Sequence, residues 1–139
     1  KLVCCGAGYL QDEVKEYAKK NNILEKIIFA GVVDNVNEYM MAMDVFIFPS
    51  LFEGFPVSIL EAQSTGLPII MSDTITKEVD LSNLVCRISL DNHASEWAKK
   101  AVEQLPKQRD TYCKIIGDTK FNIKTSIKLL ESLFINILK

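Results

Sequence analysis

The sequence is poor in the side chains that bind zinc. Its 139 residues include one histidine, His93, and four cysteines, Cys4, Cys5, Cys86 and Cys113. These five residues have no paired metal-ligand spacing, which disfavours a zinc site. Cys4 and Cys5 are neighbours in a predicted strand, so their side chains point to opposite faces. We expect the cysteines to be small core residues of a reduced, cytoplasmic protein, and His93 to be structural.

Long apolar runs and a large net charge are also absent. The formal net charge is −2 at pH 7, which argues against a nucleic-acid partner held by phosphate neutralisation. No apolar run in the sequence approaches the length that spans a bilayer. Hydrophobic residues make up 48% and charged residues 24%, which are ordinary values for a globular domain. A chain of this length suits a single domain with a substantial core.

Short apolar runs alternate with helical patterns along most of the chain. Leu10, Val14, Tyr17 and Ala18, for example, fall on one helical face among charged residues. Five apolar runs are typical of buried strands and lie at residues 1–5, 27–30, 44–48, 69–71 and 85–88. This alternation predicts an α/β fold with a doubly wound, largely parallel sheet flanked by helices.

The most informative stretch is residues 49–66, which follows the third predicted strand. A loop holding Glu53 and Gly54 leads to Pro56, which is favoured as the first residue of a helix because it needs no N–H there. Gly66 can end that helix in the left-handed conformation. The stretch therefore predicts a loop and a helix between two strands.

This local geometry predicts a ligand-binding turn. The N–H groups between Gly54 and Ser58 lie at or near a helix N-terminus, where phosphate binds without a basic side chain. Glu53 precedes this turn and Glu61 follows it in the helix, so the two carboxylates could flank a diphosphate. Carboxylates accept hydrogen bonds from vicinal hydroxyls such as those of ribose. A nucleotide sugar carries sugar hydroxyls, a diphosphate and ribose hydroxyls in that order.

The order of these residues resembles the donor-site signature of retaining glycosyltransferases with two Rossmann-like domains. The matching residues are Phe48-Pro49-Ser50, Glu53-Gly54-Phe55-Pro56, Glu61-Ala62 and Gly66-Leu67-Pro68. The resemblance implies that Glu53 holds the hydroxyls of the donor sugar and that Glu61 holds those of the ribose. It also implies a diphosphate cradle made by Gly54, Phe55, Pro56, Val57 and Ser58.

Two other turns are weaker candidates. Gly6 and Gly8 follow the first predicted strand and, by the resemblance, line the donor cleft. The third glycine of the dinucleotide-binding fingerprint is absent, and a tight strand-to-helix turn explains both glycines equally well. Val32 and Val33 follow the second strand, and the resemblance implies that they contact the nucleobase. Their interpretation as ordinary apolar residues of the core or a loop stays open.

The polar segment Ser72-Asp73-Thr74 follows the fourth predicted strand. Ligands collect at the carboxyl ends of strands in open α/β sheets, so a second ligand-facing loop is one interpretation. The favoured interpretation is a cap for the turn over residues 75–79.

A helical extension is expected over residues 107–139, with helices at 109–117 and 121–138. An apolar stripe runs along the second of these helices and consists of Ile127, Leu130, Leu133, Phe134 and Ile137. The stripe either packs on the sheet of this domain or docks on a partner domain or a membrane face. We expect it to be partly uncovered.

The resemblance covers residues 1–105 and implies the nucleotide-sugar-binding C-terminal half of a longer enzyme. The implied parent moves a hexosyl group from a nucleoside diphosphate sugar, with UDP-sugars favoured, to a glycan or glycolipid acceptor in polysaccharide biosynthesis. Glu53 is the implied catalytic residue, and no metal ion or other cofactor is implied. A cytoplasmic location is expected, with peripheral association at the inner membrane face.

The family's acceptor-binding N-terminal domain, and the basic residues that neutralise the leaving phosphate, would precede Lys1. Stabilising the leaving group is usually the larger electrostatic contribution to catalysis. We therefore expect residues 1–139 alone to bind donor but hardly to turn it over.

Two other functions stay open. A nucleotide-sugar epimerase or a phosphorylase can use the same two-domain scaffold, although an epimerase would be expected to add catalytic acids and a histidine. This sequence offers little beyond Glu53 and Glu61 for that chemistry. The other alternative is a non-catalytic nucleotide-binding module.

Overall fold

The computed structural model describes residues 1–105, 117 and 119–138. The chain divides into two compact units, Lys1–Glu38 and Tyr39–Lys139. The expected helix at 109–117 lies outside the described residues except for Gly117, and so does Cys113.

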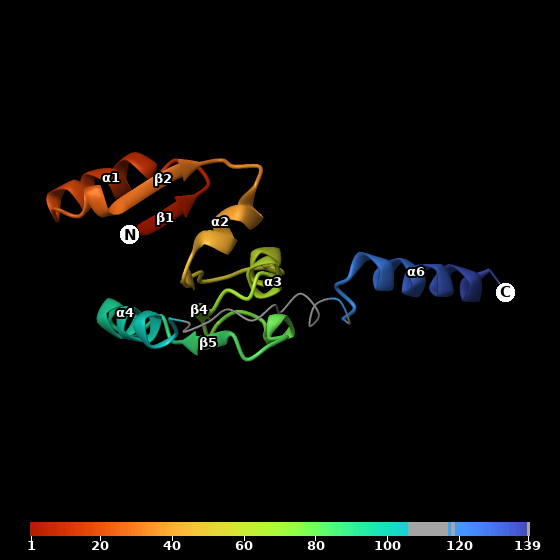
Figure 1. Cartoon of the computed structure of the whole chain (residues 1–139). Coiled ribbons are helices and arrows are strands. Elements are labelled where there is room, and N and C mark those ends of the chain that lie inside the picture. The colour runs from red at the N-terminus through yellow and green to blue at the C-terminus, as the bar shows by residue number, and fades with distance from the viewer. Residues whose placement is uncertain (106–116, 118, 139) are drawn as a thin grey trace. The chain divides into compact units, whose positions relative to one another are not determined.

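The first unit is a parallel strand pair with one long helix (Figure 1). Strand β1 (Leu2–Cys5) pairs with β2 (Ile27–Gly31), and the connection contains α1 (Gln11–Lys20) and a short 3-10 helix, η1 (Leu24–Lys26). Acidic residues in the first turn of α1 and lysines in its last turn complement the helix dipole.

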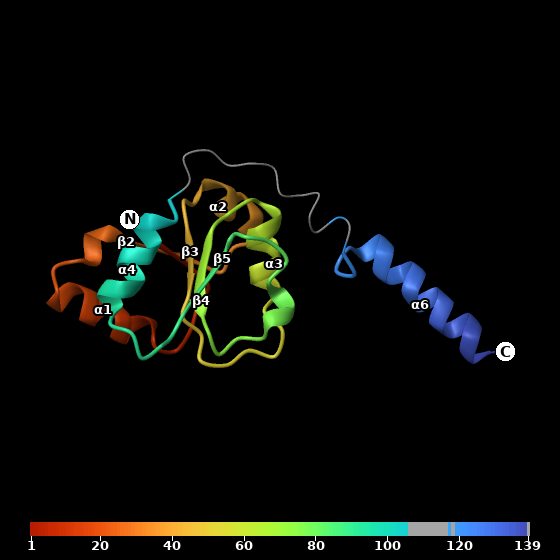
Figure 2. The ribbon, with the colours of Figure 1, turned by 90° about the horizontal axis from the view of Figure 1, so that it is seen from below.

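The second unit is a parallel three-stranded sheet with helices on both sides (Figure 2). The chain enters this unit within α2 (Val36–Ala42). Its strand order is β3-β4-β5, with β4 central. The remaining elements are β3 (Phe46–Phe48), α3 (Val57–Ser64), β4 (Ile69–Ser72), the 3-10 helix η2 (Lys77–Val79), β5 (Val85–Ile88), α4 (Ala94–Glu103) and α6 (Ile123–Ile137).

The core of the second unit is built around β4. All four of its residues are buried, and Ile69, Ile70 and Met71 are fully shielded from solvent. Ile70 packs with Trp97 of α4 and Ile88 of β5 on one face. Ile69 and Met71 point to the other face because side chains alternate along a strand. Helices α3 and α4 lie on opposite sides of β4 in Figure 2.

The strand predictions are confirmed within one or two residues at each end, and so is the α/β class with parallel strands flanked by helices. The strands pair as a two-stranded ladder in the first unit and a three-stranded ladder in the second. The prediction that the cysteines are core residues is wrong for Cys5, which is exposed, whereas Cys4 and Cys86 are half-buried. Cys5 is the last residue of β1, where the chain leaves the ladder.

Helix α3 begins one residue later than the proline signal predicts. Pro56 has φ −79° and ψ 92°, an extended conformation, so it precedes the helix and Val57 is the first helical residue. The helix ends as predicted at Gly66, whose φ is +70°. The Gly66 N–H donates to the Gln63 carbonyl at 3.0 Å, and the Leu67 N–H donates to the Ala62 carbonyl at 3.0 Å. This pair of bonds is a Schellman motif.

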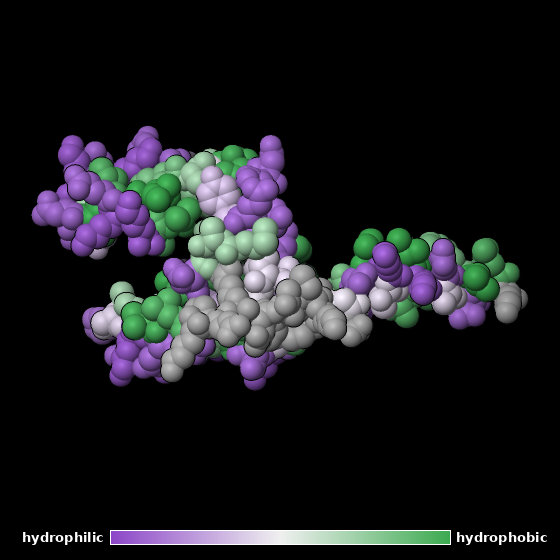
Figure 3. All heavy atoms as spheres, viewed as in Figure 1, coloured by the Kyte–Doolittle hydropathy of each residue, from purple (hydrophilic) through white to green (hydrophobic). Residues whose placement is uncertain are grey.

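The last helix, α6, carries the expected apolar stripe on its surface (Figure 3). The exposed fractions are 48% for Ile127, 53% for Leu130, 57% for Phe134 and 68% for Ile137, which confirms that the stripe is partly uncovered. Among the described residues, no helix has the length and apolar character needed to cross a membrane.

A buried glutamine joins α3 to the segment after β4. Gln63 is only 1% exposed. Its Nε2 donates to the Ile59 carbonyl at 3.2 Å and to the Val79 carbonyl at 2.7 Å. Its Oε1 accepts from the Leu81 N–H at 3.1 Å and from Ser82 Oγ at 2.8 Å. One side chain therefore makes four hydrogen bonds and fixes residues 79–82 against the helix.

We predict that Gln63→Leu strongly destabilises the protein. It removes the four hydrogen bonds of the Gln63 amide, to the Ile59 and Val79 carbonyls, the Leu81 N–H and Ser82 Oγ. At about 0.5–1.5 kcal/mol for each bond, the loss of unfolding free energy should be about 2–4 kcal/mol. Urea unfolding, followed by the fluorescence of Trp97, the single tryptophan, measures this loss of unfolding free energy. Gln104→Leu, at the end of α4, is the control and should shift stability by less than about 0.5 kcal/mol. A similar small loss for Gln63→Leu would contradict the prediction.

Candidate functional site

The strongest candidates lie in the loop between β3 and α3, at the carboxyl end of β3. Glu53 is half-buried in this loop, whereas Gly54 and Phe55 are exposed. Because β3 and β4 are parallel, the segments that follow them emerge at the same edge of the sheet. The predicted ligand turn therefore lies where open α/β sheets bind ligands.

Ser50 holds the carboxylate of Glu53. The Ser50 hydroxyl donates to Glu53 Oε1 at 2.8 Å. An ionised carboxylate has about four acceptor positions on its two oxygens. One bond to Oε1 thus orients the group while leaving most of its capacity for ligand hydroxyls.

Backbone donors at the start of α3 are available to a ligand. Among the hydrogen bonds of the described residues, none is donated by the amides of Gly54, Phe55, Val57 or Ser58. The Ile59 N–H begins the helical pattern by donating to the Pro56 carbonyl at 3.1 Å. The first N–H groups of a helix have no intrahelical acceptor, and the helix dipole favours negative charge there. This turn can therefore hold an anionic group without a cationic side chain.

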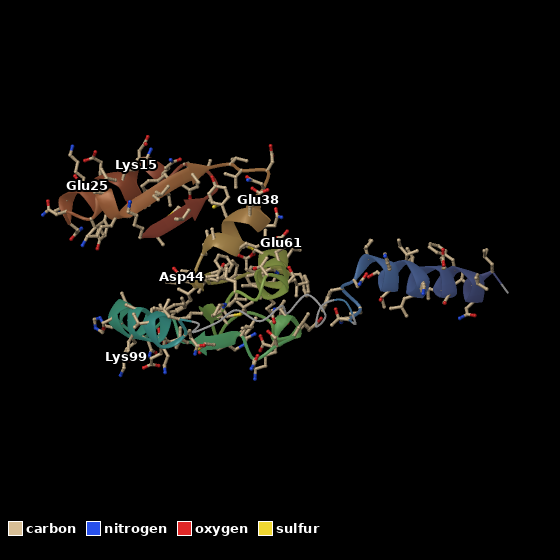
Figure 4. The ribbon with its side chains drawn as sticks, viewed as in Figure 1. Lys15, Glu25, Glu38, Asp44, Glu61 and Lys99 are labelled. Atoms are coloured by element: carbon tan, nitrogen blue, oxygen red, sulfur yellow. The ribbon has the colours of Figure 1, made fainter. Side chains whose placement is uncertain are left out.

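Glu61 lies on the same strand–loop–helix segment, in the second turn of α3. Its side chain is exposed (Figure 4), whereas its neighbours Ala62 and Gln63 face the core. The amphipathic placement leaves the carboxylate accessible to a ligand.

Residues far along the chain also contact this loop. The rings of Phe55 and Phe121 lie 5.1 Å apart between centroids. Next to Phe121, Lys120 Nζ lies 3.6 Å from Glu78 Oε2. The segment that precedes α6 therefore packs against the candidate turn, and the sequence carries no local signal for this contact.

The segment after β4 supports the loop rather than capping a helix. Thr74 Oγ1 donates to the Leu51 carbonyl at 2.9 Å. The cap of η2 is instead Thr76, whose hydroxyl accepts from the Glu78 N–H at 3.3 Å. The favoured prediction for Ser72-Asp73-Thr74, a cap, is therefore wrong for Thr74, because its hydroxyl faces the neighbouring loop.

The weaker candidates belong to the first unit. Gly6, with φ +122°, donates its N–H to the Gly31 carbonyl at 2.6 Å. Gly8 accepts from the first residue of α1. Val32 is 80% exposed and Val33 is half-buried after β2. These residues share the carboxyl edge of the β1–β2 ladder, and the glycines have a structural use there. Their ligand contacts stay predictions, as do those of residues 53–61.

Shifted pKa values occur outside the candidate turn. Burial, with a smaller contribution from Cys5, raises the pKa of the Cys4 thiol, which makes Cys4 a poor nucleophile. On the surface of α4, the Lys100–Glu103 hydrogen bond of 2.7 Å raises the pKa of Lys100 and lowers that of Glu103. No group of three or more His, Cys, Asp or Glu residues in the described part of the chain could hold a metal ion.

Comparison with known proteins gives a family match over most of the chain. The family model described as Glycosyl transferases group 1 matches residues 1–103. EpsF of Bacillus subtilis (strain 168) is 45% identical over 100 residues, which are 71% of this chain and 26% of EpsF. A UDP-Gal:α-D-GlcNAc-diphosphoundecaprenol α-1,3-galactosyltransferase of Escherichia coli is 42% identical over 73 residues, 52% of this chain and 19% of that enzyme. The matches thus span about a quarter or less of these relatives.

Solved structures share the fold at low sequence identity. TarM matches with a TM-score of 0.77 at 16% identity, over 94% of this chain and 28% of TarM. HepE of Anabaena, solved in complex with UDP, matches with a TM-score of 0.69 at 16% identity, over 94% of this chain and 40% of HepE. At this identity the likeness concerns the fold alone, and it confirms the predicted α/β fold class.

Proposed function

Because this chain belongs to the glycosyl transferases group 1 family, we propose that it is the donor-binding domain of a retaining glycosyltransferase. The complete enzyme moves a hexosyl group from a nucleoside diphosphate sugar, with UDP-sugars favoured, to an acceptor. The observation that carries the proposal is one short segment with a Ser50-oriented carboxylate on Glu53 and, directly after it, backbone amides without partners among the described residues.

Each part of a nucleotide sugar has a matching group in this segment. The diphosphate is anionic and suits the amides of residues 54–58 at the start of α3. The donor sugar presents neutral hydroxyls, which donate to the carboxylate of Glu53. The ribose hydroxyls donate to Glu61, which is exposed on α3. Gly6, Gly8, Val32 and Val33 of the first unit are proposed as further contacts, the two valines to the nucleobase.

The chemical role of the turn follows from where charge develops. When the glycosidic bond breaks, negative charge grows on the departing diphosphate, and preorganised N–H groups stabilise it. Glu53 holds the sugar in place through its hydroxyls while the acceptor attacks. Because these backbone N–H groups can hold the diphosphate without a metal ion, we propose a metal-independent transfer. It should proceed at the same rate in excess EDTA.

The acceptor and the place of action are proposed from the relatives. The Escherichia coli relative is named for a diphosphoundecaprenol-linked acceptor, and another relative, of Rhizobium meliloti (strain 1021), for mannosyl transfer in lipopolysaccharide core biosynthesis. We propose a glycan or glycolipid acceptor for this family member as well. Its complete protein would act in polysaccharide biosynthesis at the cytoplasmic face of the membrane.

The first test is calorimetry of the complete protein with UDP, GDP and ADP and with their sugar conjugates. We expect one nucleoside diphosphate to bind along with one of its sugars. Release of that diphosphate on addition of a glycan acceptor supports the transferase. Interconversion of two nucleotide sugars without release indicates an epimerase, and sugar phosphate formation that requires inorganic phosphate indicates a phosphorylase. Binding without turnover indicates a non-catalytic module, and no binding refutes the proposal.

The second test removes one amide from the proposed cradle. Proline is favoured at the first position of a helix, and the extended Pro56 tolerates a following proline. Val57→Pro should therefore keep the fold while weakening nucleoside diphosphate binding by about tenfold to a hundredfold, the cost of one hydrogen bond to a charged group. Val57→Ala keeps the N–H and is the matched control. Equal affinity of the two variants would exclude phosphate binding by this amide.

The third test separates the two acids in the complete protein. Glu61→Gln should weaken the nucleoside diphosphate and the nucleotide sugar alike, each by about one to two powers of ten, because both ligands contain the ribose. Glu53→Gln should leave nucleoside diphosphate affinity nearly unchanged and lower sugar transfer. Calorimetry with both ligands measures the difference. If Glu53→Gln weakens the bare diphosphate as much as Glu61→Gln does, the assignment of roles is wrong.

A further inference from the structure

Two loops at the carboxyl edge of the second unit's sheet are tied together by hydroxyl groups. Thr74, after β4, donates from Oγ1 to the Leu51 carbonyl at 2.9 Å, across 23 positions of sequence. The Ser72 and Thr74 hydroxyls lie 2.8 Å apart, and Ser72 Oγ also accepts from the Thr74 N–H at 3.2 Å. A hydroxyl has one proton to donate. Since Thr74 donates to Leu51, Ser72 is the donor to Thr74.

Leu51, which accepts the Thr74 hydrogen bond, belongs to the same loop as the candidate carboxylate of Glu53. Leu51 lies between Ser50, whose hydroxyl binds Glu53 Oε1 at 2.8 Å, and Glu53 itself. A displacement of the Leu51 peptide would move both ends of that bond. Thr74 therefore fixes the backbone on which the Ser50–Glu53 bond is built.

The segment that carries Thr74 is itself rigidly held. Ser72 is fully buried at the end of β4. Arg87 of β5 makes two bonds to the Asp80 carboxylate, at 2.9 Å and 2.8 Å. It also donates to the Ile75 carbonyl at 2.7 Å and to the Thr76 carbonyl at 2.8 Å. The residues on both sides of Thr74 are thus anchored to the sheet, so its hydroxyl is a fixed donor.

We propose that Thr74 and Ser50 are positioning residues that aim the Glu53 carboxylate at the donor sugar and thereby set the preference among sugars. This inference rests on the proposed function. Epimeric sugars differ only in the direction of one hydroxyl, so a carboxylate discriminates between them only if it is held to about half an ångström. The Thr74–Leu51 and Ser50–Glu53 bonds restrict the backbone and the carboxylate, respectively.

A structural role and a positioning role differ in what they change. A hydroxyl that only supports the fold would affect stability, and with it every ligand, in the same direction. A hydroxyl that acts through Glu53 affects the contribution of the sugar and leaves the diphosphate contribution unchanged. The ratio of nucleotide-sugar affinity to nucleoside diphosphate affinity isolates that contribution.

The test compares three threonine variants in the complete protein. Thr74→Val removes the hydroxyl at nearly constant shape, and Thr74→Ser retains it. Thr76→Val removes a hydroxyl from the same segment that caps η2 and is the control. We expect Thr74→Val to lower the affinity ratio, and the preference between two epimeric donors, by about fivefold, the effect of one neutral hydrogen bond. Thr74→Ser should restore both values, and Thr76→Val should leave them unchanged.

A double-mutant cycle decides whether Thr74 acts through Glu53. In a Glu53→Gln background, Thr74→Val and Ser50→Ala should no longer alter the ratio. If Thr74→Val lowers the ratio equally in both backgrounds, Thr74 contacts the donor itself and the inference is overturned. If Thr74→Val alone leaves the affinity ratio unchanged, the inference is also overturned. The proposed function still stands in that case, provided that the protein binds the nucleotide sugar. If the folded wild-type protein binds no nucleotide at all, both this inference and the proposed function are refuted.

Discussion

The burial of β4 on both faces is the constraint from which the rest of the second unit follows. A strand whose residues are all shielded from water must be covered by elements on both sides of its sheet. Helices that accompany parallel strands lie on the faces of the sheet and so meet that requirement. Each crossover between parallel strands also returns the chain to the same end of the sheet. The loops after β3 and β4 therefore emerge together. That common edge is what allows Thr74 to reach Leu51 and what gathers the candidate residues of this unit in one place.

Strands and helix ends could be predicted well because the residues that specify them lie within or beside each element. Residues 85–88 form a strand as their alternation predicts, and Gly66 takes the left-handed conformation that ends α3. Two of the errors lie at the ends of elements. Proline favours the first helical position, but the extended conformation of Pro56 delays the helix to Val57. Cys5 has the apolar character of a core residue, yet it ends its strand and is exposed.

The supporting contacts of the site could not be predicted because they join distant parts of the chain. Gln63 meets Val79 and Ser82, Thr74 meets Leu51, and Phe55 meets Phe121. Serine, threonine and glutamine occur on most surfaces, so their residue types carry no sign of these partners. The order of Glu53, Gly54, Pro56 and Glu61 predicts a ligand turn, because each of these residues has a local physical reason for its place. How that turn is held rigid depends on the packing of the sheet.

An anionic ligand beside two carboxylates poses an electrostatic problem, and the geometry of the turn offers a solution. A carboxylate that points at a diphosphate would repel it, whereas one that points at sugar or ribose hydroxyls gains charge-assisted hydrogen bonds. In the proposed complex the amides before and within the first turn of α3 face the phosphates, and Glu53 must face away from them. The Ser50 hydroxyl donates to Glu53 Oε1 and so holds the carboxylate within its own loop, which is the restraint that this arrangement needs. A chain with a net charge of −2 can thus hold a doubly charged ligand, provided that its acids are aimed as firmly as its amides.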